Sequence, residues 1–436
     1  MLIGIDDTDS DEGMCTTYLA AVLAEELNAF GTVVEYPYLI RLNPTIPYKT
    51  RGNAALGIEL KLTDDAPKTK RHLVDFVSNK IRETAEVMCE KTNPGAVFIF
   101  EDAYDAMRDP LNIFFKKAVT SVIEIDEAKK LAADFESKYE EDVFHFTLKN
   151  GRGLIGALAV CGAVLNPDWD ETYEYLAYRL KNKTMTRSVD ERSLFLADEK
   201  TTPETWDTID RTRKTKPFPV CVPAGKDPVL FGIRGNSAEA VAAAAEFVVS
   251  EEIERRQIFK TNQGTDMHLI CTETIREIAP LHSYILNGTV ISESKTIEGG
   301  HDIFEIQDQT GEVLTCAAFE PTGDFRHMIR KLIPGDEIRI YGSFKNETFN
   351  LEKIRINTLA DAFQTENPIC PMCEKHMKSA GAAQGFRCLD CKTKADAKIT
   401  TKQERLISIG YYEVPPSARR HLSKPLIRYS KEELKK

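Results

Sequence analysis

Two pairs of cysteines near the C-terminus constrain the fold of this chain more than any other feature. Cys370 and Cys373 form one CxxC pair, Cys388 and Cys391 form a second, and 14 residues separate the pairs. Two tight CxxC turns can present four thiolates in a tetrahedron, which is the geometry of structural Zn²⁺ sites. The pattern therefore predicts a zinc ribbon with no open coordination position.

Five short runs of alternating apolar and polar residues precede the ribbon. They are SYILNGTVISE, DIFEIQD, EVLTCAAF, DEIRIYGSF and FNLEKIRI, between residues 283 and 356, and the helical stretch DFRHMIRKLI lies between the third and the fourth. Five strands with a helix at this place are the order of an OB-fold β-barrel. OB barrels bind single-stranded nucleic acid on one face of the sheet.

The charge of the chain is uneven. The net charge is −11, yet residues 370–436 hold 15 Lys and Arg against 7 Asp and Glu. After the ribbon, basic residues alternate with aromatic ones: Arg405, Arg419, Arg420, Lys424 and Arg428, with Tyr411, Tyr412 and Tyr429 between them. Basic side chains neutralise phosphates, and Tyr rings stack on bases. Barrel, ribbon and tail together favour RNA or DNA binding.

The first 280 residues alternate between strand and helix patterns, as in a mixed α and β architecture. LIGI and YEYLAYRL, PVCVP and LFGIRG are predicted strands. A charged helix is predicted from about Lys68 to Lys91, an apolar helix follows Gly-rich residues at 151–165, and an Ala-rich helix covers 237–250. Residues 255–269 are polar and irregular, so we expect a site loop there.

A crowded acidic stretch, IDDTDSDEGMCTTY, spans residues 5–18 between a strand and a helix start. A calcium-binding EF-hand loop is excluded, because its sixth position would be Glu12 and its twelfth Tyr18. An aspartyl-phosphate hydrolase with Asp7 as nucleophile remains open, as does a solvated loop that caps the helix.

A Mg·ATP site is the third hypothesis for this stretch. Magnesium takes one or two carboxylates together with phosphate oxygens. Asp6, Asp7 and Asp9 would supply those carboxylates. Lys49, Arg51 and the backbone amides near Thr16 would meet the phosphates.

Several longer motifs carry a family resemblance. GIDDTDSDEGMCTTYL, LIRLNPTIPYKTRGNAA, KTNPGAV, GRGLIGALA and TNQGTDMH, followed by the barrel and the ribbon, resemble the archaeal TiaS family of tRNA(Ile) 2-agmatinylcytidine synthetases. The resemblance covers essentially the whole chain. It implies a carbon–nitrogen ligase that uses ATP, converted to AMP and phosphate, to join agmatine to C2 of the wobble cytidine of isoleucine tRNA through a phosphorylated C2 oxygen. The modified tRNA then decodes AUA.

The resemblance also implies site residues. Asp6, Asp7, Asp9 and Thr16 would be catalytic, with Thr16 autophosphorylated and Thr17 as the fallback. The three aspartates with Lys49, Arg51, Gly52 and Asn53 would bind ATP and Mg²⁺. Arg152 and, in TNQGTDMH, Thr261, Asn262, Gln263, Thr265, Asp266 and His268 would contact RNA or substrate. A tight turn at 151–153 and a hydrogen-bonded interdomain loop at 261–268 are the alternatives. Asp168 and Asp170 are candidates for the guanidinium of agmatine.

The expected architecture is multidomain α+β. It has a kinase-like α/β domain (1–135), a ferredoxin-like α+β domain (136–278) that can interleave with the first, an OB-fold (279–360), and a zinc ribbon with a basic tail (361–436). No run of 18 apolar residues and no basic, apolar leader occurs, so we expect a cytoplasmic protein. Two rival functions remain. A non-catalytic OB and ribbon binding protein leaves the acidic loop without a role, and a small-molecule phosphotransferase leaves the C-terminal third without one.

Overall fold

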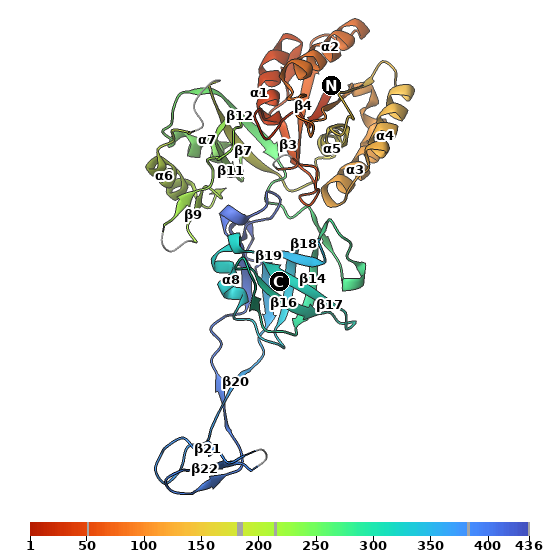
Figure 1. Ribbon diagram of the computed structural model, residues 1–436. Coiled ribbons are helices and arrows are strands. Elements are labelled where there is room, and N and C mark those ends of the chain that lie inside the picture. Colours follow the sequence, from red (N-terminus) through yellow and green to blue (C-terminus); the bar gives the residue numbers. More distant parts are fainter. Residues whose placement is uncertain (50–51, 181–185, 213–215, 382–383, 435–436) are drawn as a thin grey trace.

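The computed structural model describes residues 1–49, 52–180, 186–212, 216–381 and 384–434. Figure 1 shows three parts along the long axis of the molecule: an α/β body, a β-barrel below it, and a small β-unit on a narrow stalk. None of the described helices has the length and the apolar composition that a membrane span requires.

One continuous sheet runs through the α/β body. Within the described residues it has ten strands, in the order β6-β5-β1-β4-β3-β12-β7-β11-β8, with β2 paired to β4. The strands are β1 (Leu2–Asp6), β2 (Gly31–Val33), β3 (Tyr38–Arg41), β4 (Ala54–Leu62), β5 (Gly95–Ile99), β6 (Val143–Thr147), β7 (Thr172–Arg179), β8 (Thr205–Trp206), β11 (Val229–Gly235) and β12 (Ile253–Thr261). The halves meet where β12 pairs in parallel with β3, through Lys260 opposite Tyr38 and Thr261 opposite Leu39. The two regions predicted as N-terminal domains therefore share a sheet.

Helices cover both faces of the first half of this sheet (Figure 1). They are α1 (Thr16–Glu26), α2 (Pro67–Thr84), α3 (Tyr104–Thr120), α4 (Ile125–Lys138) and α5 (Leu154–Leu165). Side chains alternate along β1, so Leu2 packs in the apolar cluster with α3 and α5, whereas Ile3 and Ile5 pack with α1 and α2. The apolar helix predicted at 151–165 is confirmed as α5, which is buried along almost its whole length.

The second half of the sheet carries α6 (Glu191–Thr201) and α7 (Ala238–Glu246), beside the short hairpin of β9 (Ile209–Asp210) and β10 (Phe218–Pro219). The Ala-rich helix is thus confirmed, although it ends four residues early. PVCVP was a wrong strand prediction, because within it only Pro219 belongs to a strand. Short 3-10 helices complete the chain: η1 (Leu27–Ala29), η2 (Glu101–Ala103), η3 (Ile275–Glu277), η4 (Glu320–Thr322), η5 (Pro416–Ala418) and η6 (Leu426–Arg428).

The charged helix predicted to reach Lys91 ends instead at Thr84. Ala85 has an extended backbone, and the residues after it turn back toward the acidic loop. Glu86 N donates to Thr8 O at 3.1 Å, and Thr92 Oγ1 donates to Asp9 O at 2.6 Å. These bonds hold the acidic loop from outside, and they explain why the polar segment leaves the helix.

The prediction of an irregular loop over 255–269 was wrong for its first half. Residues 253–261 form β12, which lies between β3 and β7 in the sheet. The strand is rich in Arg, Gln and Lys because it has charged partners on its faces, such as Glu25 for Arg255. That polarity hid the period-two pattern of a strand.

The barrel confirms the predicted OB order. Its main strands are β14 (His282–Val290), β16 (Asp302–Gln307), β17 (Val313–Ala318), β18 (Glu337–Lys345) and β19 (Thr348–Thr358), with α8 (Asp324–Ile329) between β17 and β18. The sheet closes because β14 pairs with both β18 and β16, and β17 pairs with β19. Edge strands β13 (Leu269–Cys271) and β15 (Lys295–Thr296) extend it.

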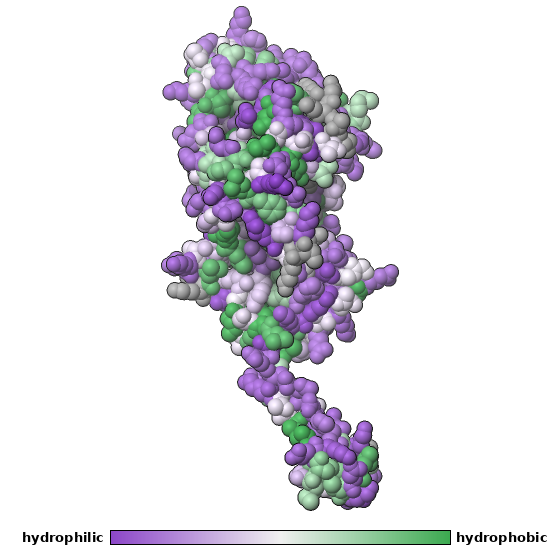
Figure 2. Space-filling view, turned by 90° about the vertical axis from the view of Figure 1, so that its left-hand side faces the viewer, coloured by the Kyte–Doolittle hydropathy of each residue, from purple (hydrophilic) through white to green (hydrophobic). Residues whose placement is uncertain are grey.

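The ribbon stands apart from the rest of the molecule on a narrow neck (Figures 1 and 2). The neck is a two-stranded ladder of β20 (Ala362–Glu366) and β24 (Ile399–Gln403). Beyond it, β21 (Lys378–Ser379), β22 (Phe386–Arg387) and β23 (Lys394–Ala395) make a small sheet that carries the cysteines. Its only apolar core among the described residues is built around Cys370, Met377 and Cys388.

The C-terminal tail (residues 404–434) returns to the body. It first adds β25 (Gly410–Glu413) to the barrel beside β19. The basic side chains of the tail form ion pairs within the protein: Arg405 with Asp336, Arg419 with Asp207, Arg420 with Glu352, Lys424 with Glu433 and Arg428 with Asp170. Tyr411 and Tyr429 pack ring against ring rather than facing solvent as a stacking platform.

Candidate active site

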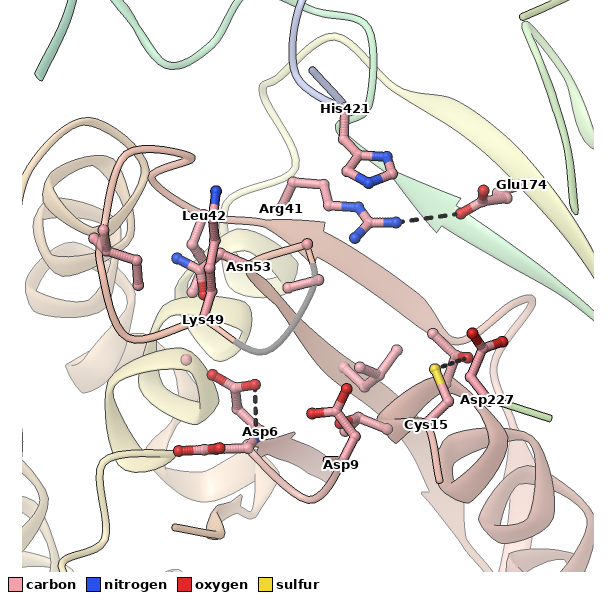
Figure 3. Close-up of a pocket in the computed structure, with 18 of the residues that line it drawn as sticks. Asp6, Asp9, Cys15, Arg41, Leu42, Lys49, Asn53, Glu174, Asp227 and His421 are labelled. Carbon is pink, nitrogen blue, oxygen red and sulfur yellow. Dashed lines mark hydrogen bonds and ion pairs between the residues drawn. The ribbon is translucent and has the colours of Figure 1, made fainter. Parts of the chain in front are cut away.

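A cavity of about 820 Å³ lies where the two halves of the α/β body meet the C-terminal tail. Figure 3 shows its interior. The first half supplies the acidic loop, the start of α1, residues from 41–49 and 52–54, and the start of α5. The second half supplies residues of β7 and β11 and residues 218–223, and the tail supplies residues from 416–421. Segments distant in sequence therefore meet in one place.

Asp6 and Asp7 lie at the floor of this cavity. Asp6 is the last residue of β1, and Asp7 has a positive φ of 60°, so the chain turns sharply at the end of the strand. Asp6 Oδ1 accepts from Asp7 N at 2.6 Å, and Arg152 Nη2 donates to Asp7 Oδ2 at 2.8 Å. Asp9 also lines the cavity. The three predicted aspartates are thus together, and Arg152 is an ion-pair partner.

Glycines of the motif GRGLIGA let α5 approach this loop. A Cβ on Gly156 would lie 2.0 Å from Asp6 Oδ2, and one on Gly153 would lie 2.5 Å from Asp6 O. Gly151 has a φ of +73°, which favours glycine. The motif is therefore the tight turn considered above, and it also fixes the place of the Asp6 carboxylate.

Burial and crowding perturb the two carboxylates. Burial, and after it the neighbouring charge of Asp7, raises the pKa of Asp6 well above its ordinary value. Burial also raises the pKa of Asp7, although the Arg152 guanidinium acts in the opposite direction. Two neighbouring carboxylates, of which one raises the pKa of the other, are stabilised by a cation placed between them and a phosphate. Within the described part of the chain, however, Asp6, Asp7 and Asp9 do not converge as three metal ligands.

Thr16 and Thr17 begin α1, and both hydroxyls are buried beside the cavity. Thr8 Oγ1 donates to Thr16 Oγ1 at 3.1 Å, whereas Thr17 Oγ1 is 2.9 Å from Cys15 Sγ. The start of the helix brings unpaired backbone N–H groups and a positive dipole end to this wall. The wall is therefore suited to phosphate oxygens.

The loop over Lys49 and Asn53 forms another wall. Lys49, Gly52 and Asn53 all line the cavity. Burial, then Arg420 and Lys345, lowers the pKa of Lys49. Its ammonium donates to Pro44 O. Arg51, which we expected to meet phosphate, lies outside the described residues.

The motif TNQGTDMH does not line the cavity. Thr261, Asn262, Gln263 and His268 are fully buried. Asn262 exchanges hydrogen bonds with the backbone of Arg41 at 2.7 and 3.0 Å, and Thr265 Oγ1 donates to Asn262 O at 2.7 Å.

The end of this motif contacts the barrel. Asp266 pairs with Lys353 at 2.6 Å, and His268 Nε2 is 3.1 Å from Glu352 Oε2. These contacts agree with the alternative of an interdomain loop, and contact with RNA stays a prediction.

Sequence reasoning missed several residues of the cavity wall: Arg41, Glu174, Asp207, Asp227, Arg234 and His421. Glu174 lies between two guanidinium groups, 3.7 Å from Arg41 Nη2 and 3.2 Å from Arg234 Nε. Figure 3 shows Arg41 beside His421 and Glu174, away from Asp6 and Asp9. Arg41, Glu174 and Arg234 come from β3, β7 and β11, and His421 comes from the tail. Asp207 lies between β8 and β9, and Asp227 lies just before β11. Nothing in the local sequence of these residues marks them as parts of a site.

The cysteines meet the requirements of a zinc site. The sulfurs of Cys370, Cys373, Cys388 and Cys391 all lie within 4.8 Å of one another. Four thiolates are the donor set of a closed structural zinc site. This site is distant from the cavity, at the far end of the neck (Figure 1).

A cavity with an acidic floor and a phosphate-binding wall, joined to an OB barrel and a zinc ribbon, defines a nucleotide-dependent enzyme that acts on nucleic acid. Comparison with known proteins gives the family. Family models described as the TiaS TCKD domain, the TiaS FLD domain and the TiaS C-terminal zinc ribbon domain match residues 2–141, 151–268 and 367–407. The chain belongs to the TiaS family, and the predicted membership and fold class are confirmed.

The likeness extends over full lengths. The chain is 52% identical to the tRNA(Ile) 2-agmatinylcytidine synthetase TiaS of Methanosarcina mazei, over 100% of this chain and 99% of that protein. It is 48% identical to the TiaS of Archaeoglobus fulgidus, over 99% and 98%. Among solved structures, a complex of TiaS with isoleucine tRNA and ATP superposes with a TM-score of 0.87 at 47% identity, over 99% of this chain and 98% of that one. A complex of TiaS with isoleucine tRNA, AMPCPP and agmatine gives a TM-score of 0.85 at 45% identity, over the same shares.

Proposed function

We propose that this chain joins agmatine to C2 of the wobble cytidine of isoleucine tRNA at the expense of ATP. The observation that carries the proposal is the cavity, which gathers the acidic loop, Thr16 and the basic wall in a chain that matches TiaS enzymes along its whole length. A binding protein without catalysis would have no use for buried, mutually repelling carboxylates. A small-molecule phosphotransferase would have no use for the barrel and the ribbon. Because the substrate is a tRNA, we place the reaction in the cytoplasm.

The chemistry requires activation of a poor leaving group. The C2 oxygen of cytidine leaves readily only after phosphorylation, and the agmatine amine then takes its place. The cytidine must be unstacked to expose C2, which costs a few kcal/mol and is easiest in an anticodon loop. The OB barrel and ribbon hold the tRNA, and the cavity holds the flipped nucleotide.

We assign ATP binding to the floor of the cavity. Because Asp6, Asp7 and Asp9 do not converge as a set of three, one or two of these carboxylates would hold Mg²⁺ together with phosphate oxygens, and the ion, when bound, would offset the negative charge of the phosphates. Arg152 orients Asp7 through its ion pair. Lys49, Gly52 and Asn53 line the wall beside the phosphates, and the role expected of Arg51 falls outside the described residues.

Thr16 is our proposed phosphoryl acceptor, with Thr17 as the alternative. Both threonines line the cavity, and Thr16 Oγ1 accepts a hydrogen bond from Thr8 Oγ1, which orients it. Thr17 Oγ1 is instead close to Cys15 Sγ. The two hydroxyls differ in surroundings, so single substitutions can separate them.

Agmatine is cationic, and we assign its guanidinium to the second half of the cavity, where Asp207 and Asp227 lie near the apolar residues 218–223. Each of these carboxylates also pairs with an arginine, Asp207 with Arg419 and Asp227 with Arg187, so agmatine would share them. Asp170, considered above, accepts from Arg428 at 2.9 Å and does not line the cavity. Asp168 does not line it either. A butyl chain with a charge at its end suits an apolar wall that ends in carboxylates.

The test is incorporation of labelled agmatine into an isoleucine tRNA transcript with Mg·ATP. We expect label in the tRNA with the native chain, and a loss of at least about 100-fold in D7A and D9A. D11A is the matched control, because Asp11 belongs to the same loop but is exposed and does not line the cavity. A transcript with U at the wobble position should stay unlabelled. No label with the native chain at any Mg²⁺ concentration would refute the proposal.

A further inference from the structure

The C-terminal tail contributes a side chain of its own to the cavity wall, His421. This residue follows the barrel and the ribbon in sequence, yet it lies beside Arg41 from β3 (Figure 3). None of the sequence patterns singles it out. Its position raises the question of what an imidazole does between basic residues.

The backbone holds His421 tightly in place. Gly264 N donates to His421 O at 2.7 Å, and Thr265 N and Asp266 N donate to Leu422 O at 3.1 and 2.8 Å. The Leu422 side chain is 1% exposed and packs in the apolar cluster of α3 and α5. The imidazole is therefore delivered on a rigid segment, and the motif TNQGTDMH is what fixes that segment.

The hydrogen bonds of the ring define its state. Arg234 Nη2 lies 2.8 Å from His421 Nδ1. A guanidinium can only donate, so Nδ1 accepts and the ring proton is on Nε2. Burial, followed by the charges of Arg41, Arg234 and Lys49, lowers the pKa of His421 well below its ordinary value. The ring is a neutral acceptor.

The ring also fills the space beside Arg41. A Cβ on Gly52 would lie 2.6 Å from Arg41 Nη1 and 2.9 Å from His421 Nε2, so the loop, the guanidinium and the imidazole are in close contact. Burial lowers the pKa of Arg41 to about 10, so the group stays charged at neutral pH. Arg41 and Arg234 have Glu174 between them, and the Asp207 carboxylate near Arg234 is shared with Arg419.

Three guanidinium groups (Arg41, Arg234 and Arg419) face three carboxylates (Glu174, Asp207 and Glu413) on this wall, and the Lys49 ammonium adds a positive charge beside them. Two guanidinium groups are planar, bidentate donors, which is the chemistry that recognises phosphoryl oxygens. A carboxylate at position 421 would cancel that charge, and a cationic side chain would repel the arginines. A neutral acceptor binds Arg234 without cancelling its charge and without repelling the arginines.

We propose that His421 is a positioning residue of the reaction, which holds Arg234 through Nδ1 and packs beside Arg41, so that the guanidinium groups on the wall opposite the acidic floor bind phosphoryl oxygens of the nucleotide. This inference rests on the proposed function, because it assumes that the cavity binds ATP. It assigns the C-terminal tail to the catalytic machinery, in addition to its contact with the barrel.

The test compares two substitutions of the same residue. H421F keeps a ring but removes the acceptor, and H421N keeps a neutral acceptor close to the position of Nδ1. We expect H421F to lower kcat/KM for ATP about 10- to 100-fold, the effect of losing a hydrogen bond to a charged group. H421N should remain within about fivefold of the native chain. H327F is the control, since His327 is an exposed residue of the barrel helix α8.

Three further measurements separate positioning from folding. Affinity for labelled ATP, by equilibrium dialysis, should fall in H421F, while affinity for tRNA should not. In an R234Q background, H421F should add little to the loss, because the two act through one contact. Equal losses in H421F and H421N, or a matching loss of tRNA affinity, would overturn the inference. So would an H421F variant that binds and uses ATP like the native chain.

The two proposals fail in different ways. If the native chain transfers no agmatine to tRNA, the proposed function is wrong. If the native chain is active and H421F is equally active, only the role of His421 is wrong.

Discussion

Replacing Gly156 with alanine tests how closely the catalytic loop depends on α5. Gly156 is the third residue of α5, and a Cβ there would lie 2.0 Å from Asp6 Oδ2. Real Cβ atoms essentially never come within 3.0 Å of such a neighbour, so the carboxylate must move by at least about 1 Å. Helix α5 has little room to retreat, because it also packs closely against α3, where a Cβ on Gly162 would lie 2.1 Å from Leu111 O.

The magnitudes favour a loss of activity over a loss of stability. Overpacking costs about 1–3 kcal/mol, but alanine in a helix recovers up to about 1 kcal/mol relative to glycine. The free energy of unfolding should thus fall by only about 0–2 kcal/mol. A displacement of about 1 Å in a catalytic group costs about 100-fold in rate.

The assay is agmatine incorporation together with urea denaturation of the same preparation. G162A is the matched control. Gly162 is in the same helix, about 9 Å further along, and its Cβ would lie 2.1 Å from Leu111 O of α3. G162A should lose stability, while the folded fraction keeps its kcat.

A double-mutant cycle adds a second check. In D6A the carboxylate is absent, so G156A should destabilise D6A by about 1 kcal/mol less than it destabilises the native chain. The reasoning is refuted if G156A transfers agmatine at the native rate, or if the cycle shows no coupling between positions 6 and 156.

Three other predictions follow from the site, the ribbon and the interdomain contact. T16A should abolish phosphate on the protein after incubation with labelled ATP, and T17A should retain it; the reverse pattern would move the acceptor to Thr17. Removing zinc with a chelator, or the substitution C388S, should weaken tRNA binding more than ATP hydrolysis, because the cysteines lie beyond the neck and far from the cavity. Equal loss of both activities would contradict a metal that only stabilises the tRNA-binding ribbon. Burial acts to raise the pKa of Glu352, but His268 and Arg420 outweigh it and hold the pKa at about 2, below the unfolded value of 4.5. The ionised Glu352 therefore stabilises the native chain above about pH 4.5, and this stability is lost as the pH falls toward 2. The melting temperature of E352Q should fall less steeply between pH 4.5 and 2 than that of the native chain. Equal slopes for the two proteins would refute the linkage.

The elements that the sequence predicted well are those whose pattern depends on local burial. The OB strands alternate because one face of each packs in the barrel, and α5 is apolar throughout because it is buried on all sides. The cysteines could be found because metal ligation requires a fixed spacing.

The elements that were missed owe their structure to distant partners. β12 has a polar sequence, and it is a strand because β3 and β7 flank it. The basic tail has the composition of a nucleic-acid-binding segment, but acidic residues from three other regions, such as Asp207, Asp336 and Glu352, neutralise it. Charge in a sequence does not show whether its counter-charge belongs to a ligand or to the same chain.

The candidate site divides in the same way. Asp6, Asp7 and Asp9 could be proposed as site residues from the sequence because they form a dense acidic cluster between a strand and a helix start. Thr16 could be proposed because its motif resembles that of the TiaS family. Glu174 and His421 could not, because each is a single ordinary residue that gains importance only from Arg41 and Arg234 beside it.

The neck of the ribbon has a consequence for the evolution and engineering of this architecture. Ala362 and Gln403 face each other across β20 and β24, and the strands on either side, β19 and β25, are themselves paired. Topologically, the ribbon is an insertion in a barrel that is continuous without it. Its two ends are adjacent, so a turn of a few residues could replace the whole module. Such a deletion would leave β25, Leu422 and His421 in place, so the ribbon could be exchanged without removing the tail residues that line the cavity.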